Sequence, residues 1–408
     1  MEVIITSLHY KFTLQILNVK ILHNIMKLNQ INNLTFYSKI IDSHCHTGHW
    51  RNNNKIQDIT LDLDVFVKSE LDNGDSIENI IVSNLDCMLH ESTDKKIEFL
   101  SDEITGNKKI LDICSKNSKF SPLATCQPKY GNVENIKKIF EENPLKFIGL
   151  KFHPEQLNVA ANNPAYMPYM EFAQKKGLPC LFHSGNSYDV YYPDGGIAKA
   201  SNVSKPEQIY ELAKKYKDVP VIIAHWGGDG EKNFNKTTDL IIESIARKDA
   251  TLYGDISWVD CNNPKKQNLK RIIERLKNEE FGLDRILFGT DAPLERFGRE
   301  GKDGLSAMQN YTNNVNDIKN MIKKEFPNEA EDIIDKIFYK NANELFFQRT
   351  TKQPPKKSDK KWGLIIAGVI VLATAIGAYF HNKPHKTAAA ESTKTQQCLD
   401  TRRCYCNQ

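Results

Sequence analysis

A pair of histidines one residue apart follows the first β-rich apolar run of the sequence. The stretch IIDSHCH (residues 40–46) places His44 and His46 on one face of a predicted strand, since successive side chains of a strand point to opposite faces. Asp42 shares that face. Two imidazoles that converge at a strand end are either metal ligands or polar residues of an ordinary loop, and this stretch alone leaves both interpretations open.

Residues that could likewise bind a metal or transfer a proton stand at the ends of later β-rich runs. They are Lys151 and His153 in GLKFHP, His183 in LFHSG, His225 in IIAHWGG and Asp291 in ILFGTDAP. Taken singly, a strand-end histidine is usually a hydrogen-bonded structural residue, and an aspartate before Ala-Pro is usually a turn or capping residue. That explanation has to hold at five strands at once, so their joint occurrence favours a metal site.

Eight β-rich runs must position these residues. The runs centre near residues 42, 82, 124, 150, 182, 223, 254 and 288. Stretches with apolar residues at three-to-four-residue spacing predict helices over 132–143, 165–177, 205–218, 238–249 and 265–282. This alternation predicts a (β/α)8 TIM barrel over residues 39–348, whose chemistry lies at the C-terminal ends of the strands. A doubly wound sheet is disfavoured because no Gly-x-Gly-x-x-Gly sequence follows any strand.

These motifs resemble the amidohydrolase superfamily. The shared pattern is His-x-His on strand 1, histidine on strands 5 and 6, and aspartate on strand 8. The four motifs quoted above, together with the closing FYKNANELF (residues 338–346), are most similar to the amidohydrolase-related branch, which contains hydrolases and non-oxidative decarboxylases. The resemblance covers residues 39–347 and is specific for the superfamily rather than for a substrate.

The resemblance implies a divalent metal held by His44, His46, His183 and Asp291. Imidazole and carboxylate ligands suit zinc best among the common metals. A cation there lowers the pKa of bound water toward about 7. Asp291 would accept the proton of that water, and His225 would polarise the substrate or act as an acid or base.

Lys151 has two interpretations under this resemblance. It is either a carboxylated lysine that bridges two metals, or an ammonium group that binds a substrate carboxylate with His153 beside it. Asp42 either supports an imidazole of strand 1 or makes a hydrogen bond at the start of that strand. We therefore expect a metal-dependent hydrolase of a small amide, ester or lactone, with one or two metal ions. The alternatives are a metal-dependent decarboxylase and a catalytically idle, membrane-tethered binding module.

Composition limits the class of partner. The formal net charge is +4 over 408 residues, which is too small to indicate nucleic-acid binding. Six of the nine cysteines are scattered through apolar stretches, as expected of reduced, buried thiols. Residues 1–38 form an N-terminal extension without the clean apolar run of a signal peptide, and Met26 is an alternative start.

The C-terminal region predicts a membrane anchor. Residues 362–380 (WGLIIAGVIVLATAIGAYF) carry no charge and would span about 28 Å as a helix. Six cations in the basic linker 349–361 precede this run, and fewer follow it closely in the tail 381–408. The positive-inside rule then predicts a single-pass protein with a cytoplasmic barrel and an external tail. The tail holds Cys398, Cys404 and Cys406, and Ala373 with Gly377 permits helix packing in a homo-oligomer.

Overall fold

The computed structural model describes the central part of the chain. It covers residues 38–348 except 53–54, 60–70, 72–73, 89, 92–97, 145, 186–189, 192–196, 199–202, 229, 261–266 and 293–303. These residues belong to the first of two units, 1–352 and 353–408. The N-terminal extension, the basic linker, the predicted membrane span and the tail lie outside the described residues, so those assignments stay predictions. Within the described ranges, no helix is long and apolar enough to cross a membrane.

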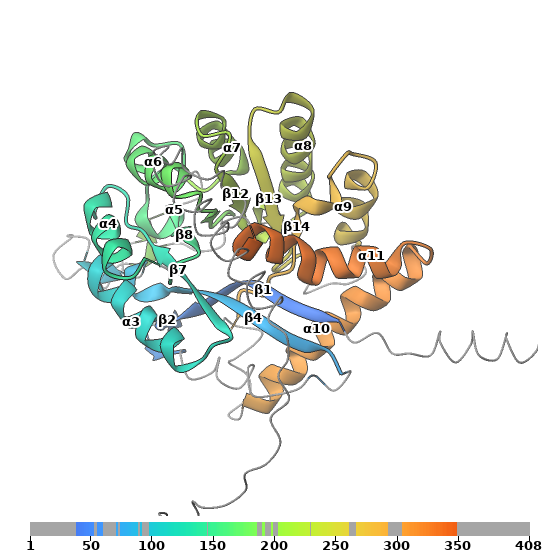
Figure 1. The fold of residues 1–408 in the computed structure, drawn as a ribbon, viewed down its shortest axis with the longest axis horizontal. Helices are drawn as coiled ribbons and strands as arrows, with labels where there is room; N and C mark the ends of the chain where they lie inside the picture. Colours follow the sequence, from blue (N-terminus) through green and yellow to red (C-terminus); the bar gives the residue numbers. More distant parts are fainter. Residues whose placement is uncertain are drawn as a thin grey trace, which may run out of the picture. The chain divides into compact units, whose positions relative to one another are not determined.

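In the part of the chain that the structure describes, eight parallel strands form the central sheet (Figure 1), and each overlaps one of the eight predicted runs. In sheet order they are β1 (Lys39–Thr47), β4 (Ser76–Asn84), β7 (Phe120–Thr125), β8 (Gly149–Phe152), β9 (Cys180–Phe182), β12 (Pro220–Ile223), β13 (Thr251–Asp255) and β14 (Ile286–Leu287). Among the described loop residues, three antiparallel pairs are found: β2 (His49–Asn52) with β3 (Lys55–Asp58), β5 (His90–Glu91) with β6 (Glu98–Phe99), and β10 (Val190–Tyr191) with β11 (Ile197–Ala198).

The sheet closes between its first and last strands. Ser43 N donates to Phe288 O at 2.9 Å, Asp291 N to His44 O at 2.7 Å and His46 N to Ala292 O at 2.8 Å. A parallel bridge also joins Cys45 to Ala292. These hydrogen bonds join the end of β1 to the segment after β14, so the predicted barrel is confirmed and the aspartate after β14 is brought beside the two histidines of β1.

Helices follow the strands and lie outside the sheet in Figure 1. They are α3 (Glu103–Lys116), α4 (Val133–Glu142), α5 (Pro154–Leu157), α6 (Met167–Lys176), α7 (Pro206–Lys215), α8 (Glu231–Arg247), α9 (Asn268–Leu276), α10 (Gly304–Glu325) and α11 (Ala330–Asp335). Short 3₁₀ segments are η1 (Leu85–Cys87), η2 (Pro164–Tyr166), η3 (Ala224–Gly227) and η5 (Leu283–Arg285), and π-helical segments are η6 (Lys336–Lys340) and η7 (Asn343–Gln348). The five predicted helices are confirmed. α8 begins at Glu231 rather than at the predicted Thr238, because the mostly polar residues of its first turns do not show the apolar spacing on which the prediction relied.

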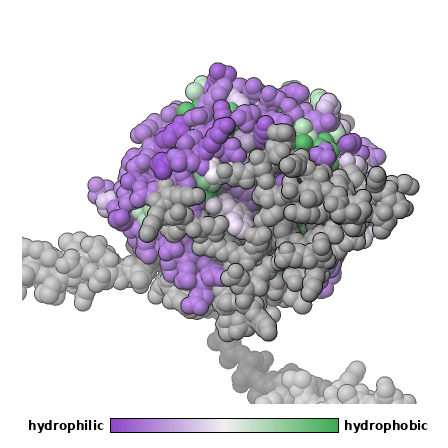
Figure 2. Space-filling model, turned by 180° about the vertical axis from the view of Figure 1, so that it is seen from behind, coloured by the Kyte–Doolittle hydropathy of each residue, from purple (hydrophilic) through white to green (hydrophobic). Residues whose placement is uncertain are grey.

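Residues that flank the helices explain where some of the helices begin and end. Asp102 accepts a hydrogen bond from Thr105 N at the start of α3, and Asn132 does the same for Glu134 N at α4. α6 ends at Gly177, whose φ of 71° lies in the left-handed region that glycine adopts without steric cost. Where Figure 2 colours the surface by hydropathy, it is mainly hydrophilic, as expected of solvent-facing helix sides.

An apolar layer fills the lower part of the barrel. Its strand residues are Ile41, Ile81, Leu123, Leu181, Ile222 and Leu287, and Ala342, Leu345 and Phe346 from the end of the described chain pack with them. On four strands the chemically functional residue follows this layer by two to four positions. The polar cluster therefore lies at the C-terminal ends of the strands, above an apolar floor that excludes water from below.

A close approach between η3 and β13 orders the turn that carries His225. Trp226 is fully buried, and a Cβ built on Gly254 would lie 2.5 Å from its ring. Any side chain at position 254 would therefore displace the indole. His225 and Trp226 have φ angles of 54° and 51°, so this turn holds two non-glycine residues in the left-handed region. Such strain persists only where the surrounding packing fixes it.

Candidate metal centre

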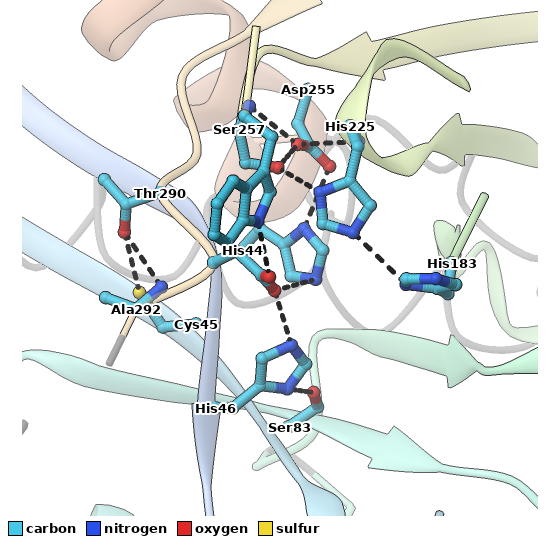
Figure 3. A network of polar contacts seen from close by, with 12 residues as sticks. His44, Cys45, His46, Ser83, His183, His225, Asp255, Ser257, Thr290 and Ala292 are labelled. Carbon is cyan, nitrogen blue, oxygen red and sulfur yellow. Dashed lines mark hydrogen bonds and ion pairs between the residues drawn. The ribbon is translucent and has the colours of Figure 1, made fainter. Parts of the chain in front are cut away.

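All seven residues predicted for the site meet in one buried cluster at the C-terminal end of the barrel. His44, His46, Lys151, His153, His183, His225 and Asp291 are each at most 7% exposed. Figure 3 shows the histidines of β1 facing those that follow β9 and β12. The structure thus brings together residues that are up to 247 positions apart in the sequence, as expected for the ends of neighbouring barrel strands.

The donor atoms that face the centre of the cluster are close to one another. His44 Nε2 lies 3.4 Å and His46 Nε2 2.9 Å from Asp291 Oδ1. His183 Nδ1 lies 3.2 Å from His225 Nε2. One donor atom each of His44, His225 and Asp291 also falls within 4.8 Å of the other two. The sequence predicted His225 as an acid or base beside the ligands, whereas the structure brings it as close to Asp291 as a ligand would be.

Four of the imidazoles have a hydrogen-bond partner at the far nitrogen, the ring nitrogen that points away from the centre of the cluster. The pairs are His44 Nδ1 with Asp255 Oδ2 at 3.1 Å, His46 Nδ1 with Ser83 Oγ at 2.9 Å, His183 Nε2 with Glu155 Oε2 at 2.9 Å and His225 Nδ1 with Ser257 Oγ at 2.8 Å. A carboxylate oxygen only accepts, so the far nitrogens of His44 and His183 carry the protons. Their near nitrogens then present lone pairs to the centre of the cluster.

The ring nitrogens of His183 and His225 test whether these residues fit a cation. Ser257 Oγ donates to Asp255 Oδ1, so it accepts from His225 Nδ1–H, and His225 Nε2 also presents a lone pair. Two lone pairs therefore face each other at 3.2 Å. That arrangement is repulsive unless a proton or a cation lies between them. Two ligands at about 2.05 Å from one ion in tetrahedral geometry are about 3.3 Å apart, so the spacing fits a shared metal.

Burial keeps the imidazoles neutral, as metal ligation requires. Desolvation lowers the pKa of His44 and His225 well below the usual value, and that of His183 to about 3. The positive charge of Lys151 lowers the pKa of His44 and His183 further. The pKa of His46 is also lowered by burial, but the hydrogen bond to Asp291 opposes this effect. His46 is the exception in tautomer, because it donates from Nε2 to Asp291 while its partner Ser83 can either donate or accept.

Asp291 combines an ionised carboxylate with a strained backbone. Burial raises its pKa, but the facing rings of His225 and His44 and the hydrogen bond from His46 outweigh burial and hold the pKa well below its usual value. Trp258 Nε1 donates to Oδ2 at 2.8 Å, which leaves Oδ1 facing the histidines. Asp291 and Trp258 have φ angles of 62° and 67°. Strained non-glycine residues of this kind concentrate at functional sites.

Lys151 and His153 supply hydrogen-bond donors rather than further lone pairs. Lys151 Nζ donates to His44 Nε2 at 2.7 Å, and burial lowers its pKa to about 8, against the opposing charges of Asp291 and Asp255. His153 Nδ1 accepts from Gln156 N at 3.3 Å, so its Nε2 carries a proton. His153, Glu155 and His183 also have ligand-type atoms within 4.8 Å, but Glu155 accepts from His183 and the ring of His153 presents N–H. That second group is therefore less suited to a cation.

The sequence predicted the inward residues but missed their supports. Asp42 does not bind a strand-1 imidazole; it accepts from Thr290 Oγ1 at 2.6 Å, from Thr290 N at 3.1 Å and from His44 N at 3.2 Å. A register irregularity in β1 between Asp42 and Cys45 turns it away from the ring. Asp255 takes that role instead. Its place at the end of the seventh run, in GDISW, is the signal that could have identified it.

Comparison with known proteins adds a family to this geometry. The family model described as "Amidohydrolase" matches residues 126–348. The search of curated protein sequences found no match. Three solved structures are similar in fold: a probable 2-pyrone-4,6-dicarboxylic acid hydrolase of Acinetobacter baumannii (14% identity, TM-score 0.46, 75% of this chain and 98% of that one), 5-carboxyvanillate decarboxylase of Novosphingobium aromaticivorans (11%, 0.46, 77% and 97%) and the IDCase of Metarhizium anisopliae (14%, 0.48, 78% and 99%). Because the family model covers more than half of the 408 residues, the chain belongs to the amidohydrolase family.

Proposed function

We propose that the protein is a metal-dependent hydrolase that acts on a small amide, ester or lactone. The observation that carries this proposal is the set of donor atoms at the barrel end. Three neutral imidazoles, those of His44, His183 and His225, are fixed by their partners with lone pairs inward, beside the ionised carboxylate of Asp291. Nitrogen and carboxylate donors in a water-poor site are what a catalytic zinc ion requires.

His44, His183 and Asp291 would hold the cation. Two residues could supply a further ligand: His225, whose lone pair faces that of His183, and His46 once its Nε2 gives up its proton. Zinc suits this donor set best, and manganese, iron or cobalt are compatible with it. The cation supplies a Lewis acid that promotes the ionisation of water at neutral pH. Lys151 currently donates to the lone pair of His44 that a cation would use, so cation binding and this hydrogen bond exclude one another.

The protein's own residues then handle the proton and the substrate. Asp291 accepts the proton of the attacking water through Oδ1 and transfers it to the leaving group, while Trp258 keeps Oδ2 in place. Where His225 is not a ligand, its Nε2 lone pair is placed to accept a proton from the substrate. Lys151 and the Nε2–H of His153 donate to the substrate's oxygen atoms. In this proposal Lys151 acts as an ammonium or amine donor, and not as a carboxylated residue that bridges two metals.

A decarboxylase is the second candidate, and one observation favours it. Lys151 Nζ contacts the ring of His44 and the ring of His153 stacks on that of His183, so both bring buried donors to the cluster, and two such donors are suited to a substrate carboxylate. In that reaction the carbon–carbon bond to the carboxylate breaks, carbon dioxide leaves, and a protein acid returns a proton to the carbon left behind. His225 would supply that proton only after its Nε2 lone pair had taken one up from the substrate or from water.

A substrate panel on the metal-loaded full chain distinguishes these functions. The protein would be stripped with chelator, reloaded with zinc or manganese, and incubated with small lactones, esters, amides and aromatic carboxylic acids. We expect metal-dependent acid release from the first group and its loss in Asp291→Asn. Carbon dioxide release from the aromatic acids would instead establish the decarboxylase. A protein that binds metal but turns over neither group would support the idle binding module and contradict both proposals.

We further propose that residues 362–380 anchor the barrel to the cytoplasmic side of a membrane. The support is the sequence alone: an uncharged run of sufficient length with more cations before it than after it. The full chain should then sediment with membranes and resist carbonate extraction, and a chain ending near Lys352 should remain in the supernatant. Release of the full chain by carbonate would contradict the anchor.

A further inference from the structure

One carboxylate, that of Asp255, supports two different histidines: His44 directly and His225 through Ser257. Asp255, the last residue of β13, is fully buried, and four donors converge on it. Its Oδ2 lies 3.1 Å from His44 Nδ1. Its Oδ1 accepts from His225 N at 3.2 Å, from Ser257 N at 3.1 Å and from the Ser257 hydroxyl. Figure 3 shows Asp255 and Ser257 above the rings of His44 and His225, on the side away from His183.

The two oxygens of Asp255 act on the two rings by different routes. Oδ2 accepts the proton of His44 Nδ1 directly, which leaves the lone pair of His44 on Nε2. Oδ1 takes the hydrogen of the Ser257 hydroxyl, so Ser257 Oγ is left as an acceptor for His225 Nδ1–H at 2.8 Å. A neutral imidazole can carry its proton on either nitrogen, and the partner of one nitrogen determines which form is present. Asp255 therefore determines both.

We propose that Asp255 is a shared positioning residue, which fixes the proton of His44 directly and that of His225 through Ser257, so that both rings turn a lone pair to one site. The proposal rests on the proposed metal-dependent function for its purpose, but the proton positions are a property of the protein without metal. Asp255 also holds the left-handed turn of His225 through that residue's backbone N–H. Asp255 thus links the end of β13 to β1 and to η3.

The substitution Asp255→Asn separates the two routes. The two backbone donors and the Ser257 hydroxyl keep the amide oxygen of Asn at the Oδ1 position, so the NH2 group falls at the Oδ2 position, opposite His44 Nδ1. That nitrogen then has to accept, and the proton of His44 moves to Nε2, where it blocks the lone pair. Ser257 still donates to the amide oxygen, so the tautomer of His225 is unchanged.

The substitution Ser257→Ala gives the opposite pattern. It removes the acceptor of His225 Nδ1–H and leaves the contact between Asp255 and His44 intact. We expect His225 to lose its fixed tautomer while His44 keeps its proton on Nδ1. Asp260→Asn is the matched control, because Asp260 is a carboxylate on the same segment that accepts from Asn268 and Leu269 N and touches neither ring.

The test uses two measurements on the full chain. Long-range ¹H–¹⁵N correlation spectra of protein labelled on histidine report which ring nitrogen is protonated, with signals assigned by single His→Gln substitutions. Competition with a chromophoric chelator reports zinc affinity. We expect Asp255→Asn to move the proton of His44 alone and to weaken zinc binding about 10- to 100-fold, Ser257→Ala to alter His225 alone, and Asp260→Asn to change neither.

Unchanged tautomers of both histidines in Asp255→Asn would overturn the proposal, and so would an altered His225 with an unaltered His44. Melting temperatures of the three variants identify any general loss of folding, since a merely structural defect would not select one ring. If wild-type protein binds no zinc, the proposed function fails, while the spectra of metal-free protein still decide the role of Asp255.

Discussion

Removing the indole donor from Asp291 should weaken metal binding by a calculable amount. Trp258→Phe keeps an aromatic ring at a half-buried position and deletes the Nε1–H that lies 2.8 Å from Asp291 Oδ2. Without that donor, the hydrogen bond from His46 is left to hold the carboxylate, so Oδ1 is less firmly held toward the centre of the cluster. The loss should therefore appear in the affinity of the site for a cation before any substrate is known.

The size of the effect follows from the bond and its exposure. A hydrogen bond to an ionised group is worth about 1.5 to 3 kcal/mol net. The side chain of Asp291 is 9% exposed and Trp258 is only half-buried, so water can partly replace the lost donor. We take the lower part of the range, about 1.5 to 2 kcal/mol, which corresponds to a 10- to 30-fold increase in the dissociation constant for zinc.

The assay is chelator competition on the full chain, with Tyr210→Phe as the matched control. Tyr210 on α7 donates its hydroxyl to both oxygens of Asp249, at 2.8 and 2.9 Å, among the outer helices. Its loss also removes a donor from a carboxylate but leaves the site untouched, so zinc affinity should be unchanged. An affinity in Trp258→Phe within twofold of wild type, with both variants equally stable, would refute the role given to Trp258 in orienting Asp291.

Three further predictions follow from other contacts. Glu155→Gln should weaken zinc binding about tenfold, measured by the same competition, because it removes the anion that holds the imidazole after β9; equal affinity would contradict this. Lys151→Met should strengthen zinc binding severalfold, because it removes a positive charge and a donor that competes for the lone pair of His44. If Lys151 were instead a carboxylated residue that bridges two metals, both the zinc affinity and the metal stoichiometry of this variant would fall. Lys319→Met should lower the free energy of unfolding in urea by about 3 to 5 kcal/mol, since it removes the lysine ammonium that lies 2.5 Å from the buried Asp75 carboxylate. The double variant with Asp75→Asn should recover stability, and a failure to recover would argue against the ion pair as the cause.

The strands and the inward residues were predictable because both follow local rules. Eight apolar runs separated by helical patterns permit few other folds, and the side chain of a residue such as His183 at a strand end points into the barrel mouth. The supports were harder to predict, because Asp255 and Glu155 meet their imidazoles only after strands distant in sequence are brought together. The irregular register of β1 is a tertiary effect as well. It turned Asp42 toward Thr290, which strict alternation of side chains does not anticipate.

Metal content tests the central claim most directly. The full chain, prepared without chelator and analysed by mass spectrometry for transition metals, should carry at least one divalent ion per chain. His44→Ala and Asp291→Ala should lose most of that metal, while Tyr210→Phe keeps it. Wild-type protein free of metal after growth with added zinc, or full occupancy in both site variants, would contradict a metal centre at these residues.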